Sequence, residues 1–175
     1  MARLTIYTIG HSTHPIDQFV AILKAHEIEQ VADVRTIPKS RHNPQFMREA
    51  LEESLPRTGI AYVHLPGLGG LRHARKDSIN LAWKNASFRG YADYMQTNAF
   101  DEALRQLIDL AMERRTAIMC AEAVPWRCHR QLIGDALPAR AIAVEDIFSE
   151  SSRKPHKFTP FAKVDGENVT YPGLF

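Results

Sequence analysis

The stretch TAIMCAEAVPWRCHR (residues 116–130) contains an apolar run, a polar loop and the beginning of a second apolar segment. Its first part, residues 116–121, is apolar enough to be a central β-strand, which would place Cys120 at the end of that strand. Pro125 is typical of the first turn of a helix, so a helix is expected to follow, with residues 128–136 inside it. A buried strand, a loop and a helix in this order are one unit of an α/β sheet.

The same alternation of apolar runs and helical periodicity extends along the whole chain. Strands are also expected over residues 4–9, 31–34, 60–65 and 139–144, and helices from residue 16, from residue 43 and over 100–111. This pattern predicts a three-layer α/β fold with a mainly parallel central sheet of about five strands. Residues 161–171 are expected to add a C-terminal β-hairpin, because Asp165-Gly166 suits a tight turn.

Length and composition favour one compact domain. The chain has 175 residues, of which 45% are hydrophobic, so we expect a single α/β domain over residues 1–150 with the tail, 151–175, packed on it. The net charge of +2 is too small to indicate nucleic-acid binding from bulk electrostatics. No apolar run reaches the roughly 20 residues of a membrane span, and no signal peptide is evident. A cytoplasmic protein with free thiols is therefore expected.

Polar side chains recur where the expected strands end, at the edge where α/β proteins bind ligands. These side chains are His11, Ser12, Asp33, Arg35, Arg41, His64, Cys120 and Glu122, together with the glycines of residues 67–70. Each has a simpler structural explanation. Ser12 can cap the next helix, Asp33 and Arg35 can form a structural pair, and His64 can be a hydrogen-bonded core residue. Their clustering is a stronger signal than any one of them.

The two cysteines have three possible roles. Arg127, Arg130 and the N–H groups at a helix start would stabilise a thiolate, which makes Cys120 a candidate nucleophile that should be partly accessible. A phosphatase loop is disfavoured, because one residue too many separates Cys120 from Arg127. A metal site could use Cys120, Cys128 and His129, with His11 or His64 from neighbouring strand ends, but the spacing is not that of a zinc finger. Both thiols could instead be buried and structural.

Five segments of the sequence resemble a known family. They are TIGHS at 8–12, DVRTIPKSR at 33–41, HLPGLGG at 64–70, YADYM at 91–95 and CAEAVPWRCHR at 120–130. In this order they resemble the bacterial and archaeal domain-of-unknown-function family numbered 488, over about residues 5–147. The closing segment HKFTPFAKVDGENVTYPGLF is also similar to the tail of many members. The resemblance implies a bacterial or archaeal origin and supports the fold and the site positions, but it names no reaction and no cofactor.

The leading functional hypothesis is a small enzyme that binds an anionic ligand, such as a nucleotide or another phosphorylated metabolite. Cys120 is the expected nucleophile, Glu122 an acid or base, and His11 a further catalytic residue. The expected ligand-binding residues are Ser12, Arg35, Arg41, His64, Arg127, Cys128, His129 and Arg130, and no metal is assigned.

Two other classes remain open from the sequence. One is a Cys/His metal-binding protein. The other is a non-catalytic nucleic-acid-binding module, for which the sequence offers the basic residues Lys39, Arg41, Arg72, Arg75 and Lys76.

Overall fold

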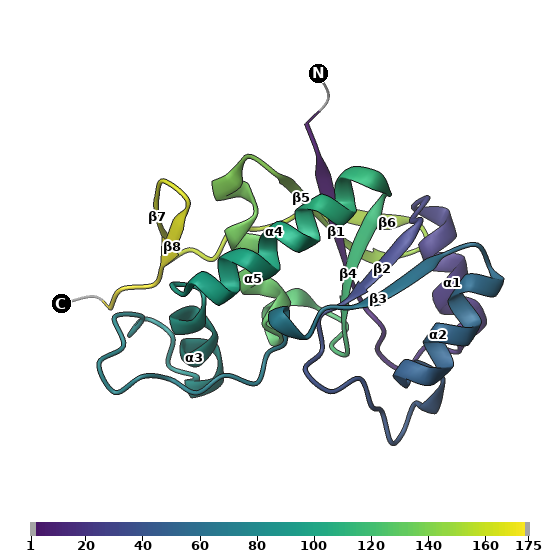
Figure 1. Ribbon diagram of the computed structural model, residues 1–175, viewed down its shortest axis with the longest axis horizontal. Coiled ribbons are helices and arrows are strands. Elements are labelled where there is room, and N and C mark those ends of the chain that lie inside the picture. Colours follow the sequence, from purple (N-terminus) through teal and green to yellow (C-terminus); the bar gives the residue numbers. More distant parts are fainter. Residues whose placement is uncertain (1–2, 174–175) are drawn as a thin grey trace.

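A central β-sheet organises the structure, a computed structural model that describes residues 3–173 (Figure 1). Within these residues the sheet has six strands: β1 (Thr5–Gly10), β2 (Gln30–Asp33), β3 (Ala61–His64), β4 (Thr116–Cys120), β5 (Ala143–Ser149) and β6 (Ser152–Pro155). Their order is β3-β2-β4-β1-β5-β6, and all neighbours are parallel except the antiparallel pair β5 and β6. The predicted mainly parallel α/β sheet is confirmed.

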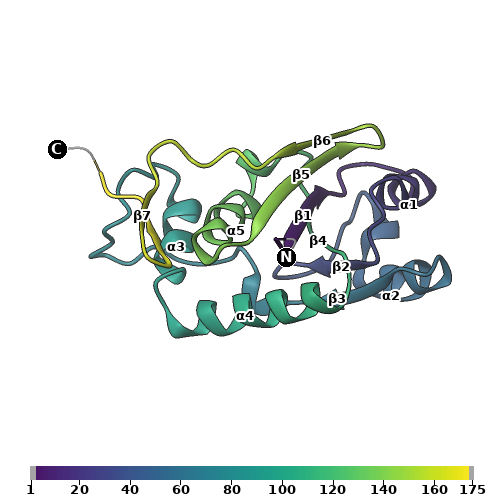
Figure 2. The ribbon, with the colours of Figure 1, turned by 90° about the horizontal axis from the view of Figure 1, so that it is seen from above.

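Helices cover both faces of this sheet, as Figure 2 shows. Across the described chain they are α1 (Ile16–Ala25), α2 (Arg48–Arg57), α3 (Ala86–Tyr94), α4 (Asn98–Glu113) and α5 (Arg130–Ala136). Successive side chains of a strand point to opposite faces. Ile6 of β1 therefore packs with Leu104 and the rest of the α3–α5 side, whereas Tyr7 packs with Phe19 and the α1–α2 side. Two hydrophobic cores, one on each face, give the expected three layers.

Strand β4 lies between β2 and β1, and all five of its residues are buried. The expectation of a central strand over residues 116–121 is thus confirmed to within one residue. Ile118 and Cys120 point into the core under α4 and α5, while Ala117 and Met119 point toward α1 and α2. Gly10 ends β1 beside Cys120 in the ladder, so the carboxyl ends of these two strands form one edge.

Several boundaries differ from the sequence expectations. The strand expected over 139–144 is found at Ala143–Ser149, because Pro138–Arg140 forms a 3-10 turn that ends at the left-handed residue Ala141. The helix expected from residue 43 begins as a separate 3-10 turn, Pro44–Phe46, before α2. Ser12 does not cap α1, whose N-cap is Pro15. Strand β6 was not expected at all.

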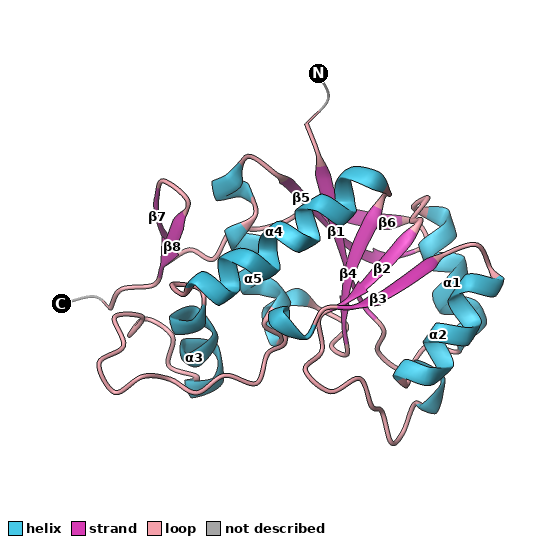
Figure 3. Ribbon diagram, in the orientation of Figure 1, coloured by secondary structure: helices cyan, strands magenta, loops and turns pink. Residues whose placement is uncertain are grey.

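The C-terminal hairpin is present as predicted, with β7 (Lys163–Asp165) and β8 (Asn168–Thr170) joined through Gly166 at φ 61°. In Figure 3 it stands apart from the central sheet, near α3. Tyr171, just after β8, is fully buried, and its hydroxyl donates to Asp135 of α5 at 2.8 Å. None of the helices within residues 3–173 is long and apolar enough to cross a membrane.

Candidate active site

The loop after β4 folds back onto the end of β1, and Gly10 makes this possible. A Cβ added at Gly10 would lie 1.6 Å from the carbonyl oxygen of Glu122, closer than any two such atoms can approach. The backbone N–H groups of His11 and Ser12 donate to the carbonyls of Cys120 and Ala121 at 2.9 and 3.0 Å. The loop is therefore held against β1 by its backbone, and Cys120 lies beneath it.

Cys128 does not lie in the first turn of a helix, as the sequence suggested. Residues Pro125–Arg127 form a short 3-10 turn, Cys128 follows it with an extended backbone, and α5 begins two residues later. Pro125 therefore begins a different helix from the one expected. The backbone of Arg130, at the start of α5, still acts to lower the pKa of Cys128.

Cys120 is buried, with 1% of its surface exposed, so the expectation that it would be partly accessible is wrong. Its surroundings are nevertheless polar. Burial raises the pKa of the thiol, but a hydrogen bond from Cys128, the charge of Arg130 and a backbone hydrogen bond from Glu122 together lower it from 9.0 to about 7. A buried thiol in purely apolar surroundings would show the opposite shift. Cys120 thus has the electrostatic environment of a reactive cysteine.

Arg130 is fully buried, and none of the salt bridges in the described part of the chain involves it. Its guanidinium donates to the Thr8 hydroxyl at 3.0 Å and to the Glu122 carbonyl at 3.1 Å, and its Nε–H has no partner. Both acceptors are neutral. A buried cation needs an opposite charge nearby. The Thr8 hydroxyl donates in turn to the buried Asp146 carboxylate, and the Cys120 thiolate is a second group that supplies negative charge.

His129 and Cys128 form the second part of the site. The Nε2 of His129 lies 2.7 Å from the carbonyl oxygen of Val34, which can only accept, so Nε2 carries the proton and Nδ1 is left as an acceptor. Nδ1 lies 3.3 Å from the Cys128 sulfur. Burial lowers the pKa of His129 to about 4, so the ring is neutral at pH 7. The hydrogen bond with Cys120, followed by burial, raises the pKa of Cys128, which therefore keeps its proton.

A cavity of about 390 Å³ opens at this edge of the sheet. Six of the residues expected from the sequence line it: Arg35, Cys120, Glu122, Arg127, Cys128 and His129. Sequence reasoning missed the apolar wall, which comes from Ile37, Leu71 and Phe88. Ile37 and Leu71 are 57% and 71% exposed. The one sequence signal that could have indicated this wall is the presence of large apolar side chains in polar loops.

His11 does not line the cavity. Its ring stacks on Phe46 at 4.2 Å, its Nδ1 donates to the Ser12 carbonyl at 2.8 Å, and its Nε2 lies 3.4 Å from a guanidinium nitrogen of Arg35. Burial lowers the pKa of His11 to about 4, so this histidine is neutral. Its position suits packing behind Arg35 rather than contact with a ligand.

Arg35 is paired with Asp33, the structural alternative that the sequence left open. Its guanidinium donates to both carboxylate oxygens of Asp33, at 2.9 and 2.7 Å, and to the Phe46 carbonyl at 2.7 Å. Tyr62 donates to the same carboxylate at 2.6 Å. His64 lies behind this pair, with its Nε2 2.8 Å from the Arg35 carbonyl. The positive charge of Arg35 is therefore already offset inside the protein.

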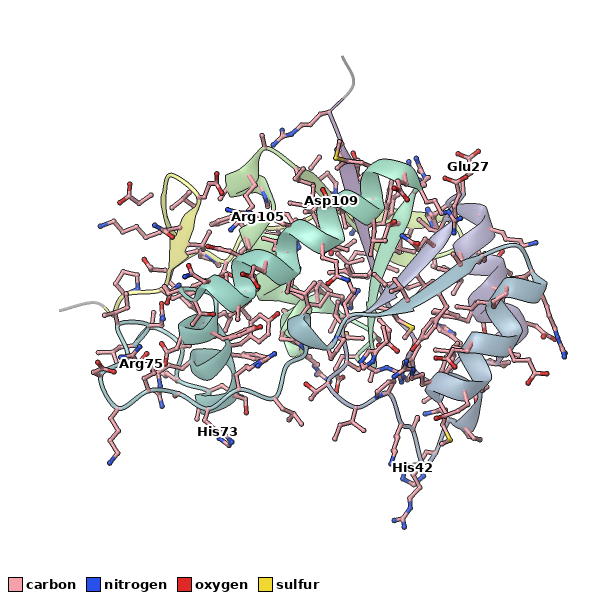
Figure 4. The ribbon with its side chains drawn as sticks, in the orientation of Figure 1. Glu27, His42, His73, Arg75, Arg105 and Asp109 are labelled. Carbon is pink, nitrogen blue, oxygen red and sulfur yellow. The ribbon has the colours of Figure 1, made fainter. Side chains whose placement is uncertain are left out.

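The remaining expected ligand-binding residues lie outside the cavity wall. Ser12 has a left-handed backbone (φ 50°) at the start of the loop before α1. Arg41 is exposed in the loop between β2 and α2, where Figure 4 shows the neighbouring His42 projecting outward. Arg130 lies behind the Glu122 carbonyl rather than in the wall.

The two alternative site types find less support in the geometry. No three His, Cys, Asp or Glu side chains within residues 3–173 form a group that could hold a metal ion. Of the basic residues considered for nucleic acid, Arg75 pairs with Asp77 at 3.0 Å, and Arg72 stacks 3.6 Å over the Tyr94 ring. These two arginines are thus partly occupied by partners within the chain.

Fold and site together define a small α/β protein with two adjacent, free cysteines at the carboxyl edge of a parallel sheet. The family model described as "Domain of unknown function DUF488" matches residues 15–137, which is more than half of the chain. The chain belongs to this family, which confirms the resemblance seen in its motifs. No curated protein and no solved structure matches the chain.

Proposed function

We propose that this protein is a small enzyme in which the Cys120 thiolate is the nucleophile and the 390 Å³ cavity binds an anionic ligand. One observation carries the proposal: a fully buried arginine, Arg130, lies beside the Cys120 thiol and has only neutral hydrogen-bond acceptors. Burying such a charge is costly unless it serves an anion. Thiolates, not thiols, are the nucleophiles of cysteine chemistry.

The charge that remains free indicates how the ligand would bind. Arg35 is neutralised by Asp33, so Lys39 and Arg127 are the cations of the cavity wall without a carboxylate partner in the described residues. They suit the phosphate or carboxylate of a nucleotide, a phosphorylated metabolite or another small anion. The apolar wall suits a flat or apolar body, and the volume is within the range of small-molecule sites.

Proton transfer in the proposed reaction falls to Glu122, whose exposed side chain lines the cavity. His11 is a positioning residue in this proposal, because it stacks on Phe46 and touches Arg35 but no part of the cavity. The initial expectation of a catalytic His11 is replaced by this indirect role.

The test is the pH dependence of alkylation at Cys120 by neutral iodoacetamide, followed by mass spectrometry of the modified peptide. We expect a half-point near pH 7, the pKa of the buried thiol. Cys120→Ser should abolish the signal, which checks that the second cysteine does not contribute. A half-point at or above the free-thiol value of about 8.5 would leave Cys120 as a structural residue.

The anionic part of the proposal has its own test, in which a haloacetamide that carries a carboxylate several bonds from its reactive carbon is compared with neutral iodoacetamide. Lys39→Ala and Arg127→Ala should each lower the alkylation rate of the anionic reagent relative to that of the neutral reagent. Neither substitution should move the pH half-point of Cys120 alkylation. If the ratio is unchanged, the cavity has no preference for anions. Steeply salt-dependent binding of DNA or RNA that Cys120→Ser leaves intact would favour the nucleic-acid-binding class instead.

A further inference from the structure

We propose that Cys120 and Cys128 act as a pair: Cys120 attacks the disulfide bond of a small anionic substrate, and Cys128 then displaces the substrate from Cys120. This inference rests on the proposed nucleophile and names its substrate class, a sulfur electrophile. It also gives the second cysteine a catalytic role that the first proposal does not need.

The arrangement of the two thiols is the first argument. They lie in one core cluster and line the same cavity, and each thiol shifts the pKa of the other. The loop that joins them packs against Gly10 through the backbone of Glu122 and Ala123. Both are free, and neither is more than 7% exposed. An intermediate formed on Cys120 therefore meets Cys128 sooner than bulk thiols.

The division of charge between the thiols is the second argument. Arg130 lies beside Cys120 and favours its thiolate. Cys128 keeps its proton and has the neutral Nδ1 of His129 at 3.3 Å as an acceptor. Cys120 is thus the thiol that attacks first. Cys128, which attacks second, can transfer its proton to Nδ1 of His129.

The leaving group is the third argument. An alkoxide or amine leaves well only when an acid protonates it, yet the ring proton of His129, the histidine of the cavity wall, is held by the Val34 carbonyl. A thiolate leaves without a proton, so disulfide exchange needs no such acid. Disulfide exchange thus needs no proton from His129 or Glu122, whereas acyl or phosphoryl transfer would depend on Glu122 alone as the acid among these two.

The proposed steps balance as follows. The Cys120 thiolate attacks one sulfur of R–S–S–R, forming Cys120–S–S–R and releasing R–S⁻. Cys128 loses its proton and attacks the Cys120 sulfur, forming the Cys120–Cys128 disulfide and releasing a second R–S⁻, which takes up a proton. The substrate gains two electrons and the protein loses two. A thiol reductant of the cell would restore the reduced pair.

The experiment uses the full chain and dithiobis(nitrobenzoate), a dianionic aromatic disulfide whose released thiolate is coloured. Wild-type protein should release two equivalents of thiolate per chain and lose two hydrogens in mass, without a retained adduct. Cys128→Ser should release one equivalent and keep a mixed disulfide at Cys120. Cys120→Ser should lose the fast phase. Circular dichroism confirms folding, and Cys128→Ala replaces Cys128→Ser if the latter is unfolded.

The outcomes separate this inference from the proposed function. A wild-type chain that stops at the mixed disulfide, with one equivalent released, overturns the role of Cys128 but leaves Cys120 as a nucleophile. A chain that fails both this assay and the alkylation test loses both proposals. Oxidised glutathione repeats the measurement with an aliphatic anionic disulfide, and absence of the internal disulfide with both probes refutes the pair.

Discussion

Removing the charge of Arg130 should raise the pKa of Cys120, and Arg130→Met tests this most directly. Methionine fills much of the same buried space but provides no charge and no N–H donors. In the wild type, the charge of the guanidinium favours the Cys120 thiolate and lowers the pKa of this thiol. Without it, burial remains as the largest influence on the thiol and acts to raise the pKa.

The size of the effect follows from the pKa of about 7 and the ordinary value of 9.0. If the variant returns to at least 9.0, the thiolate fraction at pH 7 falls about 50-fold, from one half to about one hundredth. The more basic thiolate is intrinsically about 6- to 10-fold more nucleophilic, so the alkylation rate at pH 7 should fall only about 5- to 8-fold. The half-point should move by about two pH units.

The assay is the pH profile of iodoacetamide alkylation at Cys120, compared with two controls. Arg127→Met removes an exposed cation of the same stretch, whose charge is screened by solvent, so its half-point should stay near 7. Arg130→Lys keeps the charge and should shift the half-point less than Arg130→Met. A folded Arg130→Met protein whose half-point is unchanged would refute the link between the buried arginine and the thiolate.

Two further predictions concern stability. Gly10→Ala places a Cβ 1.6 Å from a carbonyl oxygen of the loop after β4 and should lower the thermal midpoint by several degrees. Gly59→Ala, where a Cβ meets nothing within 4 Å, should cost only its left-handed strain of about 1 kcal/mol. Burial lowers the pKa of His156, but its hydrogen bonds to Asp135 and Asp146 outweigh this and raise it from 6.5 to about 9. The imidazolium therefore contributes about 3 kcal/mol, fully present below pH 6.5 and lost as the pH rises through 9. Thermal melts between about pH 6 and pH 10 should show this loss in the wild type and a flatter profile in His156→Gln; a wild-type midpoint that does not fall would contradict it.

The fold could be predicted from the sequence wherever a buried element requires apolar residues. A central strand such as β4 is apolar on both faces, so its position could be inferred from composition. Strand β6, with the sequence SRKP, is an exposed edge strand that pairs with β5 through its backbone and one ion pair, Arg153 with Glu145, so no hydrophobic pattern indicates it. Pro125 suits the first turn of a 3-10 helix as well as that of an α-helix, which explains why the start of α5 was misplaced.

The site was predictable in location but not in electrostatics. Cys120, Glu122 and Arg127 line one cavity, as their position after a strand of a parallel sheet predicted, because parallel strands end at the same edge. Arginines are rarely buried, so no sequence pattern could show that Arg130 is enclosed while Arg127 is exposed. The pairing of Arg35 with Asp33 was one alternative that the sequence offered, but only the structure distinguishes it from a free cation.

The distribution of charge also restricts the shape of any substrate. If Cys120 is a thiolate, a phosphate or carboxylate about 4 Å from its sulfur meets a repulsion of about 4 kcal/mol per unit charge near a protein surface. Arg130 is fully buried, donates to Thr8 and to the Glu122 carbonyl, and does not line the cavity, so it cannot neutralise the incoming group. The electrophilic atom must then be uncharged, and the anionic group must lie several bonds away, toward Lys39 and Arg127. A disulfide with carboxylates at its ends meets this requirement, whereas a phosphate monoester attacked at phosphorus does not.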